Sequence, residues 1–280
     1  MSRIQQIMSK AERDGTLRSR PAADRAMGSN DPAPRVVPPQ DPPLDAVDFE
    51  PPLMTARRSV DARLDPLLVA ALAPLSPASE RYRSLRTRIS QAESDGPLRA
   101  ILVTSPADGD GKTVTALNLG LTMAQEFQRR ALVIDANLRR PGIHSLLGLS
   151  RGPGLAEVLT GAATIDDALI ELSTHHLTVL RAGESNRWPT EMLGSAQMRR
   201  LVDGLRSHFD RIIVDTTPAH LADAGVVAPM TDAVVMVVRA GHTPRPAIER
   251  ALAAVAPARL LGLVLNESGD STHRRSARVA

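Results

Sequence analysis

The sequence contains no cysteine and few aromatic residues, since Trp, Tyr and Phe together make up 2% of its 280 residues. The absence of cysteine excludes disulfides, thiolate metal sites and cysteine nucleophiles. The scarcity of aromatics means that Leu, Val, Ile and Ala must fill any core, and a hydrophobic content of 42% is sufficient for that. The chain is therefore long and apolar enough for one sizeable domain with additional segments.

Long apolar runs are missing as well. No stretch approaches the roughly 20 apolar residues that a membrane-spanning helix needs, and the start of the chain lacks the apolar centre of a signal peptide. The formal net charge is only +3, which gives no indication of a nucleic-acid partner. We therefore expect a cytoplasmic protein that is associated with the inner membrane only peripherally, through a partner.

Proline is concentrated at the start, because 12 of the 22 prolines fall within the first 77 residues. Proline at this density prevents helix interiors and regular strand pairing, so we predict a disordered linker over residues 16–75. Its last part, residues 62–75, could pack back onto the domain. A short amphipathic helix over residues 1–15, either docked on a partner or frayed, is predicted by apolar residues at helical spacing behind Ser2: Ile4, Ile7, Met8 and Ala11.

The folded part is expected to begin near Ser76, which can cap a helix that starts at Pro77. Further on, short apolar runs without polar alternation, typical of buried parallel strands, alternate with helical stretches. They cover residues 99–105, 131–136, 177–182, 211–218, 232–241 and 260–268. We predict an α/β domain over residues 76–268, with a mostly parallel central sheet flanked by helices. A basic, disordered tail without tyrosine follows over residues 269–280.

The stretch VTSPADGDGKTVTALNLG, residues 103–120, follows an expected strand and opens a helix, which is the setting of a phosphate-binding loop. Gly109 and Gly111 allow backbone N–H groups to turn toward phosphate oxygens, and the start of the helix adds further free N–H groups. Lys112 can reach the β- and γ-phosphates of a nucleotide, and the Thr113 hydroxyl can bind Mg²⁺.

Three residues of this loop need an explanation. Pro106 stands where the strict pattern has its first glycine, and Asp108 and Asp110 place negative charge where a phosphate should bind. The later glycines and the lysine can bind phosphate without the first glycine. We expect Asp110 to point away from the phosphates, whereas Asp108 has no explanation from the sequence.

Two aspartates each follow a buried strand: Asp135 ends ALVID and Asp215 ends RIIVD. The carboxyl ends of parallel strands meet at the edge of the sheet that also carries the phosphate loop. Two carboxylates and the hydroxyl of Thr113 can hold Mg²⁺ there, directly or through water. We therefore predict a site for ATP and Mg²⁺ in which Lys112, Asp135 and Asp215 are the catalytic residues.

Several segments follow one another as in the bacterial tyrosine kinases of capsule and exopolysaccharide export: GDGKT, LVIDANLRRPGIH, GLAEVLTG, LTVLRAGE, HFDRIIVDTTPAHLADA and GLVLNE. The sequence resembles this family over about residues 76–268. These kinases are similar to the MinD and ParA ATPases, which are P-loop NTPases. The most specific element is VIDANLRRPGIH, which resembles the second acidic motif of the family. The N-terminus and the linker are similar to the exosortase-associated tyrosine autokinase subgroup.

The resemblance implies individual roles. Lys112 and Thr113 match the phosphate-binding lysine and the metal-binding hydroxyl, Asp135 matches the first acid of the second motif, and Asp215 matches the Walker B acid. The implied reaction is in-line transfer of the γ-phosphoryl group of ATP to a tyrosine hydroxyl, with Mg²⁺ and Lys112 neutralising the developing charge. The implied nucleotide-binding residues include the asparagine that reads adenine, Asn266, together with Gly109, Asp110, Gly111, Lys112, Thr113 and Val114.

Glu80, Arg83 and Arg86 stand as E-x-x-R-x-x-R in the first predicted helix. By spacing alone they form a solvent-exposed helix face with an ion pair. The resemblance implies instead that they form the interface of a homo-oligomeric ring. It also implies a partner, namely a membrane-spanning chain-length regulator, or polysaccharide co-polymerase.

The sequence departs from the family pattern at three points. Asn137 stands where the family usually has Asp, and an amide cannot act as a base. The tail lacks the usual tyrosine cluster, and Tyr82, the single tyrosine, lies on the apolar face of its helix with Leu85 and Ile89. Ala107 occupies the place of the second lysine of MinD and ParA, which argues against a MinD-like mechanism.

Three functions remain in competition. The first is an ATP-dependent tyrosine kinase that regulates exopolysaccharide or capsule polymerisation and export. The second is an ATP-dependent assembly module with little kinase activity, which the missing tyrosines and Asn137 favour. The third is a MinD- or ParA-like ATPase. The extent of the family resemblance favours the first.

Overall fold

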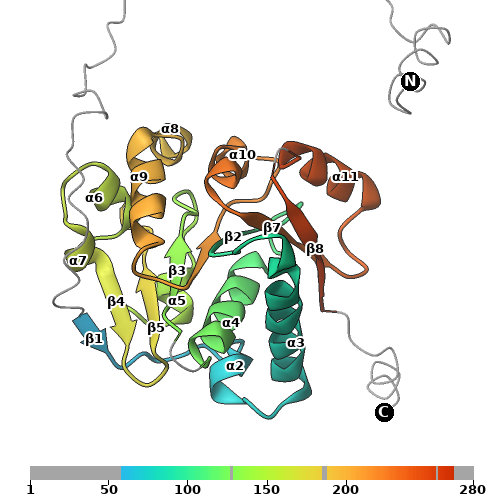
Figure 1. Ribbon diagram of the computed structural model, residues 1–280, viewed down its shortest axis with the longest axis horizontal. Coiled ribbons are helices and arrows are strands. Elements are labelled where there is room, and N and C mark those ends of the chain that lie inside the picture. The colour runs from blue at the N-terminus through green and yellow to red at the C-terminus, as the bar shows by residue number, and fades with distance from the viewer. Residues whose placement is uncertain (1–57, 127–128, 185–187, 257, 268–280) are drawn as a thin grey trace, which may run out of the picture. The chain divides into compact units, whose positions relative to one another are not determined.

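The computed structural model describes residues 58–267, apart from residues 127–128, 185–187 and 257. One sheet runs through it with the strand order β1-β4-β5-β3-β6-β2-β7-β8 (Figure 1). Neighbouring strands are parallel except β4 and β5, which are antiparallel. The strands are β1 (Arg58–Val60), β2 (Ala100–Thr104), β3 (Ala131–Asp135), β4 (Leu169–Leu172), β5 (Leu177–Leu180), β6 (Arg211–Asp215), β7 (Ala233–Arg239) and β8 (Leu260–Asn266).

The predicted α/β fold with a mostly parallel sheet is confirmed, and each of the six predicted runs contains a strand. Two further strands, β1 and β4, were not predicted from the sequence. The expected N-terminal helix, most of the expected linker and the expected tail lie outside the described residues.

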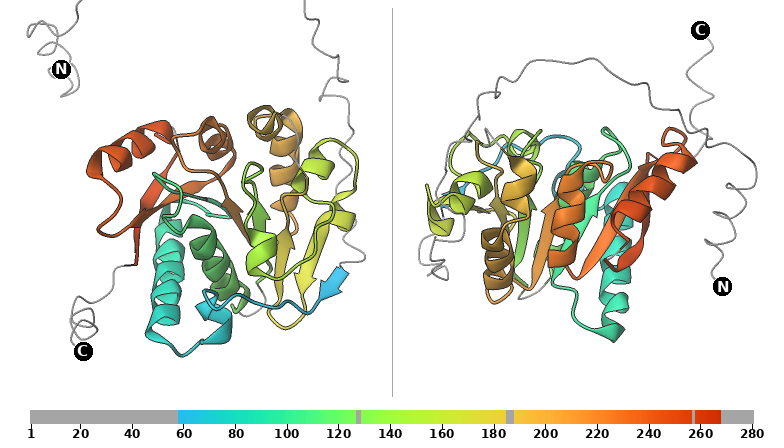
Figure 2. Two further views of the ribbon diagram at one scale, coloured as in Figure 1. Left: turned by 180° about the vertical axis from the view of Figure 1, so that it is seen from behind. Right: turned by 90° about the horizontal axis from the view of Figure 1, so that it is seen from above.

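Helices cover both faces of the sheet, as the two further views show (Figure 2). The α-helices are α2 (Val69–Leu72), α3 (Pro77–Gln91), α4 (Lys112–Ala124), α5 (Ile143–Leu146), α6 (Leu155–Leu159), α7 (Ile165–Ala168), α8 (Pro189–Leu193), α9 (Ala196–Leu205), α10 (Ala222–Val227) and α11 (Arg245–Ala254). Two 3₁₀ turns, η2 (Ala92–Asp95) and η3 (Ala228–Met230), complete the described part. As predicted, the Ser76 hydroxyl caps α3 by accepting a bond from the Ser79 N–H, and Pro77 is its first residue.

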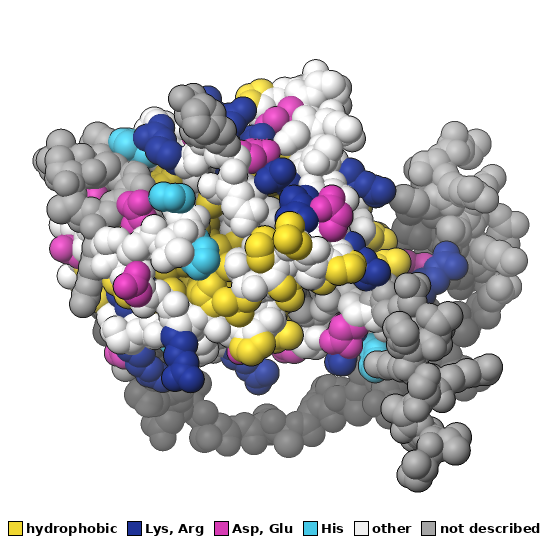
Figure 3. All heavy atoms as spheres, turned by 90° about the horizontal axis from the view of Figure 1, so that it is seen from below, with side chains coloured by type: hydrophobic (Ala, Val, Ile, Leu, Met, Phe, Trp, Pro, Cys, Tyr) yellow, Lys and Arg dark blue, Asp and Glu magenta, His cyan; other side chains and the backbone are white. Residues whose placement is uncertain are grey.

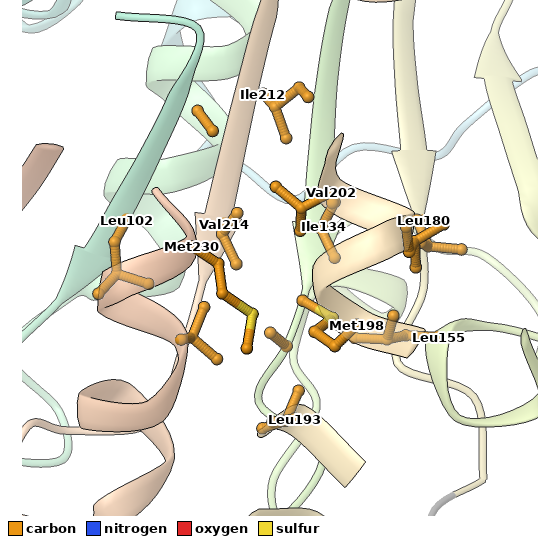
Figure 4. Packing of buried hydrophobic residues seen from close by; sticks show 14 of the residues in the cluster. Leu102, Ile134, Leu155, Leu180, Leu193, Met198, Val202, Ile212, Val214 and Met230 are labelled. Atoms are coloured by element: carbon orange, nitrogen blue, oxygen red, sulfur yellow. The ribbon is translucent and has the colours of Figure 1, made fainter. Parts of the chain in front are cut away.

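The strands bury side chains on both faces because each face packs against helices. On one face, Leu102, Ile134 and Val214 point toward α8, α9 and α10 (Figure 4). On the other face, Val103 and Ile213 pack against α2, α3 and α4. The continuous aliphatic runs of the sequence thus reflect a sheet between two apolar layers.

The packed part of the chain begins before Ser76, which corrects the boundary expected at residue 75. Strand β1 extends the sheet beside β4, and Leu68 and Ala70 are fully buried against the second apolar layer. Buried Asn118 of α4 fixes this segment, since its amide oxygen accepts a bond from the Ala70 N–H and its nitrogen donates to the Leu67 carbonyl. Residues 62–75 are therefore anchored on the domain through Leu68 and Ala70, which supports the alternative that the sequence left open.

Some large apolar side chains remain on the surface. Seen from below, hydrophobic side chains gather in a band, and basic, acidic and histidine side chains lie around it (Figure 3). The exposed large hydrophobic residues include Leu67, Leu72 and Leu75 near α2, and Leu263 and Leu265 on the edge strand β8. In the part of the chain that the structure describes, no helix has the length and apolar character to cross a membrane.

Candidate active site

The predicted phosphate loop connects β2 to α4, at the upper edge of the sheet in Figure 1. Gly109 and Gly111 have φ angles of 81° and 93°, a left-handed conformation that glycine adopts without strain. A Cβ atom on Gly111 would overlap the side-chain amide of Asn266. Both glycines are therefore required by the conformation of the loop, and the second also by its contact with the end of β8.

Asp110 stabilises this loop from within. Its carboxylate is almost fully buried and accepts bonds from the Ala107 N–H at 2.9 Å and from the Thr243 hydroxyl at 2.7 Å. The Asn266 amide donates to the Asp110 carbonyl at 3.0 Å. These contacts fix the loop against the ends of β7 and β8, which gives Asp110 and Asn266 a structural role in the nucleotide-free chain.

Asp108, which the sequence left unexplained, lies exposed at the tip of the loop. Its carboxylate is 3.8 Å from a guanidinium nitrogen of Arg140, a residue of the loop that follows β3. That separation is longer than a hydrogen bond, and both side chains are exposed, so the pair contributes little to stability.

Asp135 and Asp215 lie side by side, because they are register partners at the ends of β3 and β6. Both are fully buried. One oxygen of Asp215 accepts a bond from the Thr113 hydroxyl at 2.7 Å, and its other oxygen is buried without a hydrogen-bond partner. Such an oxygen is costly to bury unless a ligand satisfies it. The pairing brings three predicted metal-binding residues, Thr113, Asp135 and Asp215, to one place.

The two carboxylates are held differently. Asp135 accepts three backbone bonds, from the N–H groups of Asn137, Gly142 and Ile143 at 3.1 to 3.2 Å. Its position is therefore fixed by the loop after β3. Asp215 accepts only the bond from Thr113 among the described contacts, so it is the carboxylate with a free coordination position.

Burial raises the pKa of Asp135 to about 6, although the three backbone bonds and the charge of Lys112 act against the rise. Burial also raises the pKa of Asp215 to about 8, and the neighbouring charge of Asp135 adds to it, while Lys112 and Thr113 oppose it. Lys112 is itself only 8% exposed. Two buried acids with one buried lysine form a site that an additional cation would stabilise.

The residues present fit a magnesium ion that takes its other ligands from water and phosphate. They do not fit a metal ion whose ligands all come from the protein. Within the described ranges there is no group of three or more His, Cys, Asp or Glu side chains that could hold a metal ion. Two carboxylates and a hydroxyl suit Mg²⁺, which usually keeps several waters and binds phosphate oxygens in nucleotide sites. The partner-free oxygen of Asp215 supports this assignment.

Asn137, which stands in place of the usual second acid, serves the backbone here. Its side chain is 4% exposed, its N–H donates to Asp135, and its amide oxygen accepts a bond from the Arg140 N–H at 3.2 Å. The amide of Asn137 is sufficient to stabilise that turn. Unlike a carboxylate, however, it cannot accept a proton.

Arg139, Thr190 and Asp223 form a second cluster, which the sequence did not predict. Arg139 donates two bonds to the buried carboxylate of Asp223, at 2.7 and 3.1 Å, and Thr190 bonds to both. Burial alone would raise the pKa of Asp223, but Arg139 and Thr190 outweigh it and hold that pKa below its usual value. The cluster joins the loop after β3 to α8 and α10. Arg139 and Asp223 lie in two of the segments that carry the family resemblance, but nothing in the sequence pairs them with each other or with Thr190, since the three are far apart along the chain.

The residues of the expected ring interface make bonds within the chain. Arg83 pairs with Glu80 at 2.6 Å and donates to the Pro74 carbonyl. Arg86 donates to the Thr122 carbonyl at 2.6 Å and lies 3.3 Å from the Glu126 carboxylate. The structure thus shows the ion pair that helical spacing predicts, while a role in oligomerisation stays a prediction.

Tyr82 lies half-buried between α3 and α4. Burial raises the pKa of its phenol, and hydrogen bonds with Thr115 and Asn118 act in the opposite direction. Its hydroxyl is thereby engaged in packing, as its place on the apolar helix face predicted.

Comparison with known proteins places the chain in a family. No family profile matches it. It is 33% identical over 223 residues to the tyrosine-protein kinase YwqD of Bacillus subtilis, which covers 79% of this chain and 94% of that protein. It is 31% identical over 198 residues to the tyrosine-protein kinase CpsD of Streptococcus agalactiae, or 69% of this chain and 84% of that protein.

Solved structures agree with these relatives. The chimerical protein CapA2B2 is 30% identical with a TM-score of 0.69, covering 74% of this chain and 92% of its own. The kinase domain of the Escherichia coli tyrosine kinase ETK is 26% identical with a TM-score of 0.69, and the match covers 79% of this chain and 86% of that domain's chain. MinD of Pyrococcus horikoshii with Mg-ADP, at 20% identity and a TM-score of 0.52, shares the fold. The chain therefore belongs to the family of bacterial tyrosine-protein kinases, whose domain has a P-loop NTPase fold.

Proposed function

We propose that this chain is an ATP-dependent protein-tyrosine kinase that regulates the polymerisation and export of an exopolysaccharide or capsule. The observation that carries the proposal is the site at the ends of β3 and β6. There the Thr113 hydroxyl bonds to Asp215, and a second oxygen of that buried carboxylate has no partner. Family membership and the phosphate loop beside this pair support the same reading.

In this proposal Mg²⁺ is held by Thr113 and Asp215, with Asp135 beside them. The bound Mg²⁺–ATP supplies the γ-phosphoryl group and part of the charge that stabilises its transfer. The nucleotide contacts Gly109, Asp110, Gly111, Lys112, Thr113, Val114 and Asn266. Similar folds with bound nucleotide, such as MinD with Mg-ADP, support the choice of ligand for the fold as a whole.

The chain's own groups have separate tasks. Lys112, a buried cation beside the acids, neutralises charge that develops on the transferred group. Asp135 can accept the proton of the attacking hydroxyl, because burial raises the pKa of this carboxyl above its usual value and makes it a stronger base. Asn137 cannot share that task, so proton transfer depends on one carboxylate.

We propose another protein as the phosphate acceptor, because the hydroxyl of Tyr82, the single tyrosine among the 280 residues, is engaged between two helices. We propose a membrane-spanning chain-length regulator, or polysaccharide co-polymerase, as partner, which would hold the kinase at the inner membrane from the cytoplasmic side. A homo-oligomeric ring through Glu80, Arg83 and Arg86 is part of the proposal. The apolar band of Figure 3 offers additional surface for such contacts.

The remaining boundaries also stay proposals. For the residues outside the described ranges we propose a short helix over residues 1–15, a linker in the Pro-rich stretch that precedes β1, and a tail over residues 269–280. The domain itself extends to residue 268.

The proposal is tested by incubating the purified protein with labelled ATP, Mg²⁺ and the proteins encoded beside its gene. Label on tyrosine that disappears with Lys112→Met supports a kinase. Binding of ATP without transfer of label would favour the second candidate, an ATP-dependent assembly module. The observation behind that candidate is Asn137, whose amide supports a turn and cannot serve as a base.

A further inference from the structure

A polar hollow of about 590 Å³ adjoins the active-site loop that follows β3. Leu138 and Pro141 of that loop form one side, Arg151 and Glu157 another, and Arg181 to Glu184, after β5, a third. The same loop donates the backbone bonds that hold Asp135. A molecule in this hollow therefore contacts the loop that positions Asp135, the acid to which we assign proton transfer.

The wall of the hollow is preformed. Arg181 is only 6% exposed and donates to the backbone carbonyls of Ser150 and Pro153. Glu157 accepts bonds from the Gly154 and Glu184 N–H groups, which uses its carboxylate for the backbone. These contacts keep the hollow open without a ligand, as binding sites usually are.

Exposed cations lie at the rim. Arg151 is 3.8 Å from Glu184, and their side chains are 81% and 71% exposed. Arg140, which precedes the lining residue Pro141 in the chain, is equally exposed and lies 3.8 Å from Asp108. Neither separation is a hydrogen bond, so an anionic ligand can compete for both guanidinium groups. Apolar Leu138 and Pro141 also line the hollow. A fitting ligand carries an aromatic ring with acids on either side.

The chain itself contains such a segment, outside the described residues. Residues 41–50 read DPPLDAVDFE, with four acids and no Lys or Arg. Phe49 stands between Asp48 and Glu50.

The topology brings this segment within reach. Strand β1 is parallel to β4, and β4 is antiparallel to β5, so the chain enters β1 from the edge where β5 ends. Arg58 is aligned with Ile170, and Ile170 with Val179. Two strand spacings separate Arg58 from Val179, about 10 Å. In Figure 1, α6 lies at this end of the sheet above β4. The nine residues from Phe49 to Arg58 can span about 30 Å.

We propose that residues 41–50 bind in this hollow of their own chain as a substrate-like segment, with Phe49 where the acceptor tyrosine of a partner binds. This inference rests on the proposed kinase function and names its acceptor class, a tyrosine flanked by acids. A phenylalanine ring has no hydroxyl to attack the γ-phosphoryl group. The bound segment therefore competes with the acceptor and lowers the basal rate of transfer.

The position of the segment can be tested without kinase activity. A photo-crosslinking phenylalanine analogue at position 49 of the full chain should crosslink to residues 138–144 or 151–184, and its yield should not change on dilution, because the segment is tethered. The same analogue at Val36, in a Pro-rich stretch without acids, is the control. Arg151→Glu, on an exposed side chain, should lower the yield about fivefold, which corresponds to about 1 kcal/mol. Equal crosslinking from both positions, or no effect of Arg151→Glu, would overturn the proposal.

A second variant tests the acceptor class. Phe49→Tyr should become labelled at residue 49 with ATP and Mg²⁺, Val36→Tyr should not, and Lys112→Met should abolish the label. Crosslinking to the hollow without label in Phe49→Tyr would support the docking and contradict the kinase function. Label on an external acceptor without crosslinking would support the kinase and refute the docking.

Discussion

Replacing Asp215 by Asn should stabilise the nucleotide-free protein at high pH while abolishing nucleotide binding. The pKa of this buried carboxyl is raised from 3.8 to about 8. A raised pKa means that the folded state binds the proton more tightly than the unfolded state. The stability linked to Asp215 is therefore present below pH 4 and is lost as the pH rises to about 8. An amide has no charge to bury and removes this loss.

The magnitude follows from the site. The full rise in pKa sets an upper limit of about 6 kcal/mol, at about 1.4 kcal/mol for each pKa unit. The amide oxygen keeps the bond from Thr113, but the amide nitrogen takes the place of an oxygen that has no partner, which costs about 1–3 kcal/mol. We expect a net gain of about 1–3 kcal/mol at pH 8.5, or about 3–8 °C in Tm, and little gain at pH 5.

The assay is thermal unfolding followed by circular dichroism at both pH values, without nucleotide and then with Mg²⁺ and ADP. The wild-type protein should gain stability from the ligand, whereas Asp215→Asn should not. Asp135→Asn is the matched control, for which we expect a change in stability of the opposite sign. Asp135 accepts hydrogen bonds from backbone N–H groups, and an amide nitrogen in the variant would face these donors, so the variant should be less stable than the wild type. A loss of stability in Asp215→Asn at pH 8.5 would refute the reasoning.

Three further predictions concern other parts of the chain. Gly111→Ala should weaken ATP binding at least about tenfold, measured by titration calorimetry, because φ is 93° there and the new methyl group meets Asn266; unchanged affinity would contradict the loop geometry. Asp223→Ala should lower the free energy of unfolding by about 1–2 kcal/mol in urea, because Arg139 and Thr190 lose their buried acceptor while the half-exposed Arg139 can be solvated by water; a loss below about 0.5 kcal/mol would show that the pair is dispensable. Glu80→Ala with Arg83→Ala should reduce the oligomer mass in light scattering, and an unchanged mass would remove the ring interface from the proposal.

The sheet and its catalytic edge were predictable from the sequence because continuous aliphatic runs identify buried parallel strands. Asp135 and Asp215 could be placed together since both end such runs, and the register pairs them directly. The short strand β1 could not be found, because its sequence, RSV, has no pattern of its own and is paired only through β4.

Side-chain contacts between segments that are far apart in the chain could not be predicted from the sequence. The bonds of Arg139 with Asp223 join residues 84 positions apart. The buried position of Leu68 depends on Asn118 of α4, 51 positions from Leu67. No local periodicity encodes such pairs, because they arise from how the layers meet. Proline content likewise suggested a linker up to residue 75, whereas Leu68 and Ala70 are buried and Asn118 of α4 holds this segment.

The central claim is tested most directly by measuring phosphoryl transfer from labelled ATP to an acidic Glu–Tyr copolymer with Mg²⁺ present. The wild-type protein should label tyrosine, and Lys112→Met and Asp215→Asn should each reduce the rate by at least about a hundredfold. If the wild-type protein binds ATP yet transfers no label, or if both variants label tyrosine as fast as the wild type, the assignment of this site to tyrosine phosphorylation is contradicted.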